Sequence, residues 1–215
     1  MAAHASTRVT RAQRAARLRG VYGIVNESER ALEIAKGVLD AGVYIVQYRA
    51  KRGVIAQRLE ALRALTHRYD ALLIVNDDAR AATDFACDGV HLGPGDPGFA
   101  DPAALRAWLG ELLIGLSCGT VEEARLADAA GVDYLGVGSV YRTGSKSDAG
   151  DPIGIEGLTR VASATSLPVA AIGGIGVANL RQIRRSGVAM AAVISAIAGD
   201  DPYRAARELV AGWNA

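Results

Sequence analysis

The sequence is poor in features that would each indicate a particular class of protein. It has two cysteines in 215 residues, Cys87 and Cys118, and their spacing fits neither a metal-binding nor a redox motif. We therefore expect two small, partly buried residues in a protein of the reducing cytoplasm. The 24 lysines and arginines nearly balance the 23 aspartates and glutamates, which leaves a net charge of +1. This argues against a nucleic-acid-binding protein, although a local pocket for an anion would not show in that sum.

Long hydrophobic runs are also missing. Half of the residues are hydrophobic, but glycine or charge interrupts every run before it could span a bilayer, so we expect no membrane partner. The first 20 residues are basic and lack the apolar segment of a secretory signal. A transit peptide is one interpretation. We favour an N-terminal extension, residues 1–20, that includes a helix whose arginines form a solvated face: Arg8, Arg11, Arg14, Arg17 and Arg19.

Short segments rich in Val, Ile, Leu and Tyr alternate with segments of helical spacing. Strands are predicted at 21–25, 44–48, 72–75, 89–92, 112–117, 134–138, 168–173 and 191–195. Helices are predicted at 30–40, 57–69, 121–130, 155–164, 179–186 and 203–213, and glycines follow several of them. The strands are continuous apolar runs, a pattern typical of a parallel sheet covered by helices. We therefore predict a single (β/α)8 barrel as the catalytic domain, residues 21–215, with a doubly wound open sheet as the alternative.

Polar residues stand where seven of these strands end, so a barrel would gather them at one mouth. They are Gln47, Arg49 and Lys51; Asn76, Asp77 and Asp78; Asp96; Ser117; Thr143, Ser145 and Lys146; the glycines of "GGIG" (173–176); and Ser195. Each has an ordinary alternative. Arg49 and Lys51 could be rim charges, the hydroxyl-rich loop could be only a loop, and "GGIG" only a tight turn. Asp77 and Asp78 could cap the next helix. Their common position favours a shared site.

The chemistry that these residues could share is the binding of phosphate groups. Glycines let backbone N–H groups approach a phosphate, and a following helix N-terminus adds a favourable dipole. "GGIGVANL" has this form, and Ser195 completes the usual phosphate position of a barrel. Asp77 and Asp96 offer oxygen ligands that suit Mg²⁺. A second set of donors exceeds what one phosphate monoester needs, and we infer a diphosphate substrate that meets a monophosphate: Arg49, Lys51, Thr143, Ser145 and Lys146.

Taken in order, the motifs over residues 21–212 resemble thiamine-phosphate synthase, the barrel enzyme that joins the pyrimidine and thiazole halves of thiamine. The motifs that carry the resemblance are "VQYRAK", "IVNDDARAA", "DGVHLGPGD", "IGLS", "GVDYLGVGSVYRTGSK", "PVAAIGGI" and "VISAI". The resemblance implies a cytoplasmic enzyme with two small-molecule substrates, hydroxymethylpyrimidine diphosphate and hydroxyethylthiazole phosphate. The sequence leaves the oligomeric state open, and a homo-oligomer is compatible with it.

The resemblance also implies a role for each matching residue. The pyrimidine diphosphate would be held by Gln47, Arg49, Lys51, Asn76 and Ser117, with Lys146 on its diphosphate. The thiazole phosphate would be held by Thr143, Ser145, Gly174, Ile194 and Ser195. Asp77 and Asp96 would hold Mg²⁺. Three neighbours, Tyr48, Ala50 and Gly144, fall within the same expected site. Lys146, Arg49 and Ser117 would be the catalytic residues of a substitution at the pyrimidine methylene, in which diphosphate leaves and the thiazole nitrogen captures a stabilised cation.

Several positions depart from the family pattern. Asp78 and Arg80 exchange the usual arginine and acid, Gly119 replaces a histidine, Pro94 a glutamine, Asn26 an aspartate, Ser139 a proline and Ser145 a threonine. Gly119 argues against the related thiazole tautomerases, since it cannot transfer a proton. A phosphate-binding barrel without activity remains an alternative. His91 is interpreted as a hydrogen-bonded core histidine rather than a catalytic one, and His67 as a surface residue.

Overall fold

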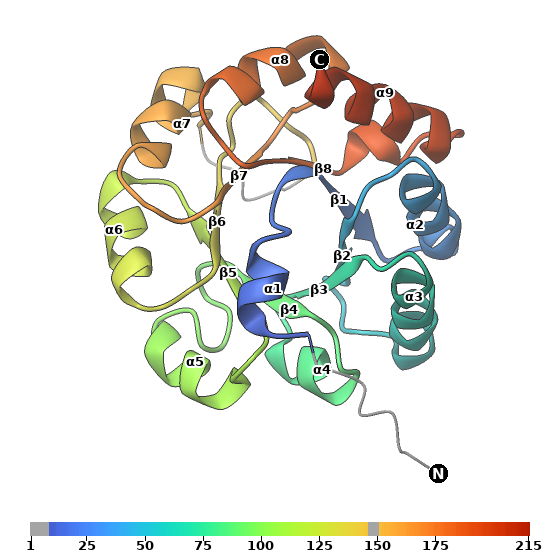
Figure 1. The fold of residues 1–215 in the computed structure, drawn as a ribbon, viewed down its shortest axis with the longest axis horizontal. Helices are drawn as coiled ribbons and strands as arrows, with labels where there is room; N and C mark the ends of the chain where they lie inside the picture. Colours follow the sequence, from blue (N-terminus) through green and yellow to red (C-terminus); the bar gives the residue numbers. More distant parts are fainter. Residues whose placement is uncertain (1–8, 146–150) are drawn as a thin grey trace.

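The computed structural model of the chain describes residues 9–145 and 151–215, and it is a closed barrel of eight parallel strands (Figure 1). The strands pair in sequence order, and β8 closes the ring against β1. This confirms the predicted (β/α)8 barrel and excludes the open sheet. Strand bounds lie within about two residues of the prediction: β1 Gly20–Asn26, β2 Ile45–Arg49, β3 Leu72–Asn76, β4 Gly89–Leu92, β5 Leu113–Cys118, β6 Tyr134–Val137, β7 Val169–Ile172 and β8 Met190–Val193.

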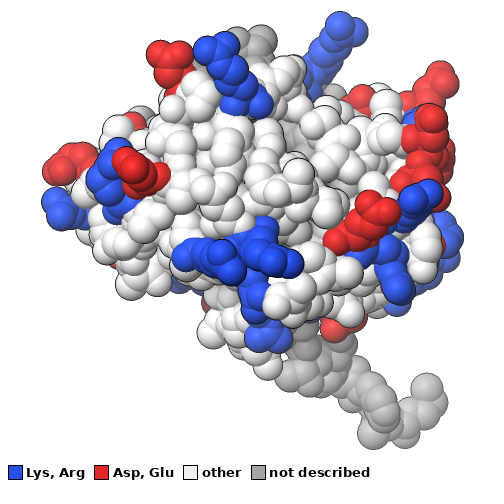
Figure 2. Space-filling model, turned by 90° about the horizontal axis from the view of Figure 1, so that it is seen from above, with Lys and Arg blue, Asp and Glu red and all other residues white. Residues whose placement is uncertain are grey.

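Helices surround the barrel on the outside (Figure 1). They are α2 Ala31–Asp40, α3 Ala56–Arg68, α4 Ala79–Asp84, α5 Pro102–Leu109, α6 Val121–Ala129, α7 Gly154–Ala162, α8 Val177–Arg185 and α9 Pro202–Asn214, with a 3₁₀ turn at Ser195–Ile197. The sequence did not predict α4 and α5, which are short. Within the described ranges, no helix combines the length and hydrophobicity that a bilayer crossing requires. On the side of the molecule in Figure 2, charges of both signs form small groups separated by uncharged surface.

Successive side chains of each strand point alternately into the barrel and outward to the helices, and this produces two apolar cores. One core fills the barrel and includes Tyr22, Leu72 and Leu113. The other lies between strands and helices and includes Val46 and Leu59. Burying each large apolar side chain stabilises the fold by about 1.5–3 kcal/mol. Together the two cores fix the strand ends, and with them the side chains at the barrel mouth.

The N-terminal segment corrects one expectation. Helix α1 (Arg11–Ala15) lies across the barrel end where the strands begin (Figure 1). Arg11 Nε lies 2.6 Å from Asp133 Oδ1, and Arg14 Nε lies 3.0 Å from Asp88 Oδ1. Both aspartates are buried, so the predicted solvated arginine face is wrong for these two arginines. Each aspartate directly precedes a strand, at the barrel end that we call the floor. The two arginines neutralise these carboxylates. Arg8 lies outside the described residues.

Candidate functional site

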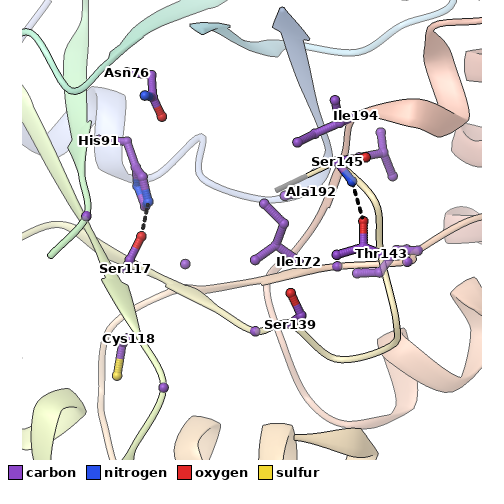
Figure 3. A pocket seen from close by; sticks show the side chains of 18 of the residues that line it. Asn76, His91, Ser117, Cys118, Ser139, Thr143, Ser145, Ile172, Ala192 and Ile194 are labelled. Atoms are coloured by element: carbon purple, nitrogen blue, oxygen red, sulfur yellow. Dashed lines mark hydrogen bonds between the residues drawn. The ribbon is translucent and has the colours of Figure 1, made fainter. Parts of the chain in front are cut away.

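A pocket of about 410 Å³ opens at the mouth of the barrel. Figure 3 shows polar side chains from β3, β4 and β5 on one side of it, including Asn76, His91 and Ser117. Apolar side chains of Ile172 and Ile194 lie across from them. A cavity of about 20 Å³ in the barrel interior shares part of this lining. The pocket therefore offers a polar wall and an apolar wall to a flat heterocycle.

The structure brings most of the predicted site residues together. The main pocket is lined by Lys51, Asn76, Asp77, Asp96, Ser117, Thr143, Ser145, Gly174, Ile194 and Ser195. Gln47 and Arg49 line the smaller cavity beneath it. Segments separated by well over a hundred residues in the sequence thus face one space, as the predicted barrel requires.

Three predicted residues, Tyr48, Ala50 and Gly144, line neither of these two cavities. The Tyr48 side chain is buried in the outer core and its hydroxyl donates to Glu27. A pocket contact by that side chain is therefore contradicted, because alternation turns it away from the barrel interior. Ala50 lines a neighbouring groove, and Gly144 a separate surface depression beside Thr143. Lys146 lies outside the described residues.

Two carboxylates and a lysine form the charged part of the pocket. Asp77 has a left-handed backbone with φ of 68°, and its carboxylate Oδ2 lies 2.7 Å from Lys51 Nζ. Asp96 Oδ2 accepts from the Gly93 N–H at 2.7 Å. Burial raises the pKa of Asp96, and the neighbouring Asp77 carboxylate raises it further, against the opposing Gly93 bond. The two carboxylates fit a divalent cation, which would favour the charged form of Asp96.

Two buried donors in the pocket region have no hydrogen-bond partner in the described part of the chain. They are Arg49 Nε and Asn76 Nδ2. The other end of the Arg49 guanidinium is fixed, since Nη1 donates to Asn26 Oδ1 at 2.9 Å. Unsatisfied buried donors are costly, so these two atoms indicate where a ligand with oxygen or nitrogen acceptors would bind.

The opposite side of the pocket has the form of a phosphate site. Gly173 and Gly174 have φ of 104° and 64°, respectively, the region that favours glycine. A Cβ at Gly174 would lie 2.7 Å from the carbonyl oxygen of Arg142, so the loops after β6 and β7 touch there. The Ser145 N–H donates to Thr143 Oγ1 at 3.2 Å. This bond lies within the loop that carries the two hydroxyls (Figure 3). The Tyr141 N–H, which donates to the Gly173 carbonyl at 3.1 Å, joins that loop to the glycine turn.

His91 and Glu123 are among the lining residues that were not predicted as site residues. His91 is hydrogen-bonded as expected, with Nε2 3.2 Å from Ser117 Oγ, but it also lines the pocket. Glu123 lines it as well, and its Oε2 accepts from the Gly119 N–H at 2.7 Å. The signal for Glu123 was available, because Thr120 and Glu123 form a capping box at the start of α6.

Comparisons with known proteins point to one family. A family model described as thiamine monophosphate synthase matches residues 21–197. The chain is 48% identical over 183 residues to the thiamine-phosphate synthase of Archaeoglobus fulgidus, covering 83% of this chain and 84% of the relative. It is 38% identical over 203 residues to that of Caldivirga maquilingensis, covering 91% and 97%. The solved thiamine phosphate pyrophosphorylase of Pyrococcus furiosus superposes with a TM-score of 0.81 at 34% identity, covering 92% and 96%.

The chain belongs to the thiamine monophosphate synthase family. The structure shows where three of the departures from the family pattern lie. Asp78 is the N-cap of α4, and its Oδ1 accepts from the Ala81 N–H at 2.8 Å. Arg80 is exposed, and its Nε lies 3.9 Å from Asp84 Oδ2. Asp78 and Arg80 therefore have different partners, the N-terminus of α4 and Asp84. Gly119 stands at the pocket wall without a side chain that could transfer a proton.

Proposed function

We propose that this pocket joins hydroxymethylpyrimidine diphosphate to hydroxyethylthiazole phosphate, giving thiamine phosphate and diphosphate. One observation supports this most strongly. The acidic pair with Lys51 and the glycines and hydroxyls of the phosphate site line the same pocket. Two anionic substrates can therefore be held with their reacting atoms between the two sites, which lowers the entropic part of the barrier.

The pyrimidine diphosphate is assigned to the polar wall. Arg49, Lys51 and Asn76 supply positive charge and amide donors to its diphosphate, and the unpartnered Arg49 Nε and Asn76 Nδ2 support this placement. Asp77 and Asp96 would hold Mg²⁺. When bound, Mg²⁺ supplies Lewis-acid stabilisation of charge on the leaving diphosphate. Among the described residues no cluster of three or more His, Cys, Asp or Glu side chains occurs. Mg²⁺ commonly takes its remaining ligands from water and substrate phosphate.

The thiazole phosphate is assigned to the glycine–hydroxyl side. Gly174, Ser195, Thr143 and Ser145 would bind its phosphate, and Ile194 would contact the ring. In the reaction the bond from the pyrimidine methylene to oxygen breaks and its electron pair leaves with the diphosphate. The thiazole nitrogen then supplies the pair for the new carbon–nitrogen bond. The residues of the chain orient both partners and stabilise the developing charge.

Further features stay predictions. The role of Lys146 on the diphosphate rests on the family resemblance. The free thiols Cys87 and Cys118 support the cytoplasmic location. Burial raises the pKa of each thiol, Cys118 to about 11, so both are unreactive at neutral pH. A homo-oligomer also remains a prediction.

The test is product formation from the two purified heterocycles with and without Mg²⁺. We expect thiamine phosphate to form only with the metal present. Asp77→Asn should lower kcat/KM about a hundredfold or more, because removal of one metal ligand weakens charge stabilisation by several kcal/mol. Asn tolerates the left-handed backbone, so the fold should persist. Asp78→Asn, which keeps the helix cap, is the matched control and should stay active. Binding of thiazole phosphate without any product would contradict the proposal and favour a binding protein.

A further inference from the structure

A line of hydrogen bonds crosses the barrel interior from β2 to β5. Gln47 Nε2 donates to the Tyr22 hydroxyl at 2.8 Å, and the Tyr22 and Tyr134 hydroxyls lie 2.9 Å apart. The Tyr134 hydroxyl lies 3.2 Å from His91 Nδ1, and His91 Nε2 lies 3.2 Å from Ser117 Oγ. We call these five side chains the polar relay. Its ends, Gln47 and Ser117, are both assigned to the pyrimidine diphosphate, so the inference below rests on the proposed function.

Two glycines make room for the rings of the polar relay. A Cβ at Gly115 would lie 2.1 Å from the Tyr134 ring and 2.6 Å from His91 Nδ1. A Cβ at Gly136 would lie 2.8 Å from His91 Cε1. The Tyr22 and Tyr134 rings meet edge to face with centroids 6.0 Å apart. The barrel therefore fixes the relay in place by packing as well as by hydrogen bonds.

The hydrogen bonds of the polar relay have a preferred direction. Burial raises the pKa of both tyrosines far above its ordinary value, so each keeps its hydroxyl hydrogen. In the described part of the chain, the Tyr22 hydroxyl contacts Gln47, from which it accepts, and Tyr134. Its own hydrogen is satisfied when it donates to Tyr134, whereas the opposite direction leaves a buried donor unpaired, which is costly.

This direction fixes the remaining bonds. When Tyr134 receives the Tyr22 hydrogen bond, its own hydrogen goes to His91 Nδ1. His91 Nε2–H then donates to Ser117 Oγ, and the Ser117 hydrogen turns to the pocket. In the other tautomer Ser117 would donate to His91 and present only lone pairs to the pocket. Only the first arrangement offers a hydrogen to an acceptor atom of this substrate, a diphosphate oxygen or a ring nitrogen.

We propose that the polar relay holds His91 as the neutral Nε2–H tautomer, and that His91 is a positioning residue that aims the Ser117 hydroxyl hydrogen at an acceptor atom of the pyrimidine diphosphate. His91 itself transfers no proton in this arrangement. Its effect on substrate passes through Ser117, while the phosphate of the second substrate binds at Thr143 and Ser195 and is independent of it.

The first test is ¹⁵N NMR of the labelled, substrate-free protein. Long-range proton–nitrogen correlations distinguish the two neutral imidazole tautomers, and the chain has 3 histidines, so spectra of His67→Gln and His91→Gln assign the signals. We expect the Nε2–H tautomer at His91, and a mixture with the other tautomer in Tyr22→Phe, where the directing bond is lost. The Nδ1–H tautomer in the unmodified protein would overturn the inference. This readout needs no catalysis, so it can fail or succeed independently of the proposed function.

The second test compares two substitutions of His91 kinetically. The amide of His91→Gln lies near the Nε2 position and can still donate to Ser117, whereas that of His91→Asn lies near Nδ1. We expect His91→Asn to raise KM for the pyrimidine diphosphate about tenfold, the value of one charge-assisted hydrogen bond, and His91→Gln to recover most of it. KM for the thiazole phosphate should be unchanged in both. Equal increases for both substrates, or no change in either variant, would show that His91 only supports the core.

Discussion

At the scale of single residues, Gly174 links the phosphate site to the loop after β6. Its φ of 64° and the 2.7 Å approach that a Cβ would make to the Arg142 carbonyl oxygen leave no room for a side chain. We expect Gly174→Ala to push the two loops apart and to raise KM for thiazole phosphate about tenfold, since each 1.4 kcal/mol is a factor of ten. Gly176→Ala is the matched control, because nothing lies within 4 Å of its Cβ position. Steady-state kinetics with each substrate varied in turn measure this effect. Equal KM values for thiazole phosphate in the two variants would contradict the assignment of Gly174 to the phosphate site.

Pocket residues could be predicted from the sequence where a charged or hydroxyl side chain stands at the end of a predicted strand. Lys51, Asp77 and Ser195 stand at strand ends with charged or hydroxyl side chains, and the barrel brings them into one pocket. Tyr48 was misplaced because inclusion in a motif does not say which way a side chain points, and alternation turns it outward. His91 was assigned correctly to a hydrogen-bonded core position. Its place in the pocket depends on glycines of β5 and β6, a packing effect between segments that one sequence does not display.

At the scale of elements, Asp128 of α6 holds the turn that leads into β7. Its carboxylate accepts from the Ser166 N–H at 2.9 Å and from the Thr165 hydroxyl at 3.1 Å. The Ser166 N–H contributes most to lowering the pKa of Asp128, with the Thr165 and Ser166 hydroxyls adding to it. A lowered folded-state pKa stabilises the fold above the unfolded-state pKa, near 4, and this contribution disappears as pH falls through the folded value.

We therefore expect Asp128→Asn to lower Tm near pH 7, and the difference from the unmodified protein to shrink as the solution is acidified below about pH 4. Thermal unfolding followed by circular dichroism over that pH range measures it. Asp84→Asn serves as the control, since its carboxylate is exposed and lies 3.9 Å from Arg80. A Tm difference that stayed constant with pH would show that the Asp128 charge is not what stabilises the turn.

A helix could be predicted from the sequence where its apolar residues recur on one face over several turns. Helices α2 and α9 have such faces, and their ends were predicted to within about two residues. Helices α4 and α5 were missed because their 6 and 8 residues give too few turns for a period to show. Their caps were visible, since Asp78 and Asp101 accept N-terminal backbone bonds. Short helices in a barrel are therefore better sought through caps than through periodicity.

At the scale of the whole molecule, the barrel separates stability from function at its two ends. Asp133 on the floor accepts from the Ile114 N–H at 2.8 Å and pairs with Arg11 and Arg106, with 3% of its side chain exposed. Asp133→Ala should reduce the free energy of unfolding by about 3 kcal/mol or more, because it removes the carboxylate partner of two arginines and leaves the Ile114 N–H without its acceptor. The KM values, set at the other end, should change little.

Urea unfolding measures that loss, and Arg17→Ala is its control. Arg17 pairs with Asp70, whose side chain is 93% exposed, so the control should cost about 1 kcal/mol or less. Equal effects of the two substitutions would show that the floor pairs are ordinary surface contacts. The sequence did not reveal this floor, because the arginines of the first 20 residues and their aspartate partners lie about 50 to 120 positions apart.

The central claim is that one pocket holds both anionic substrates, and a crystal structure with thiamine phosphate, diphosphate and Mg²⁺ tests it most directly. The account predicts diphosphate against Arg49, Lys51 and Asn76, the metal between Asp77 and Asp96, and the product's phosphate at the turn of Gly174 and Ser195. Diphosphate and product bound at separate places on the molecule, or a metal away from both aspartates, would contradict it.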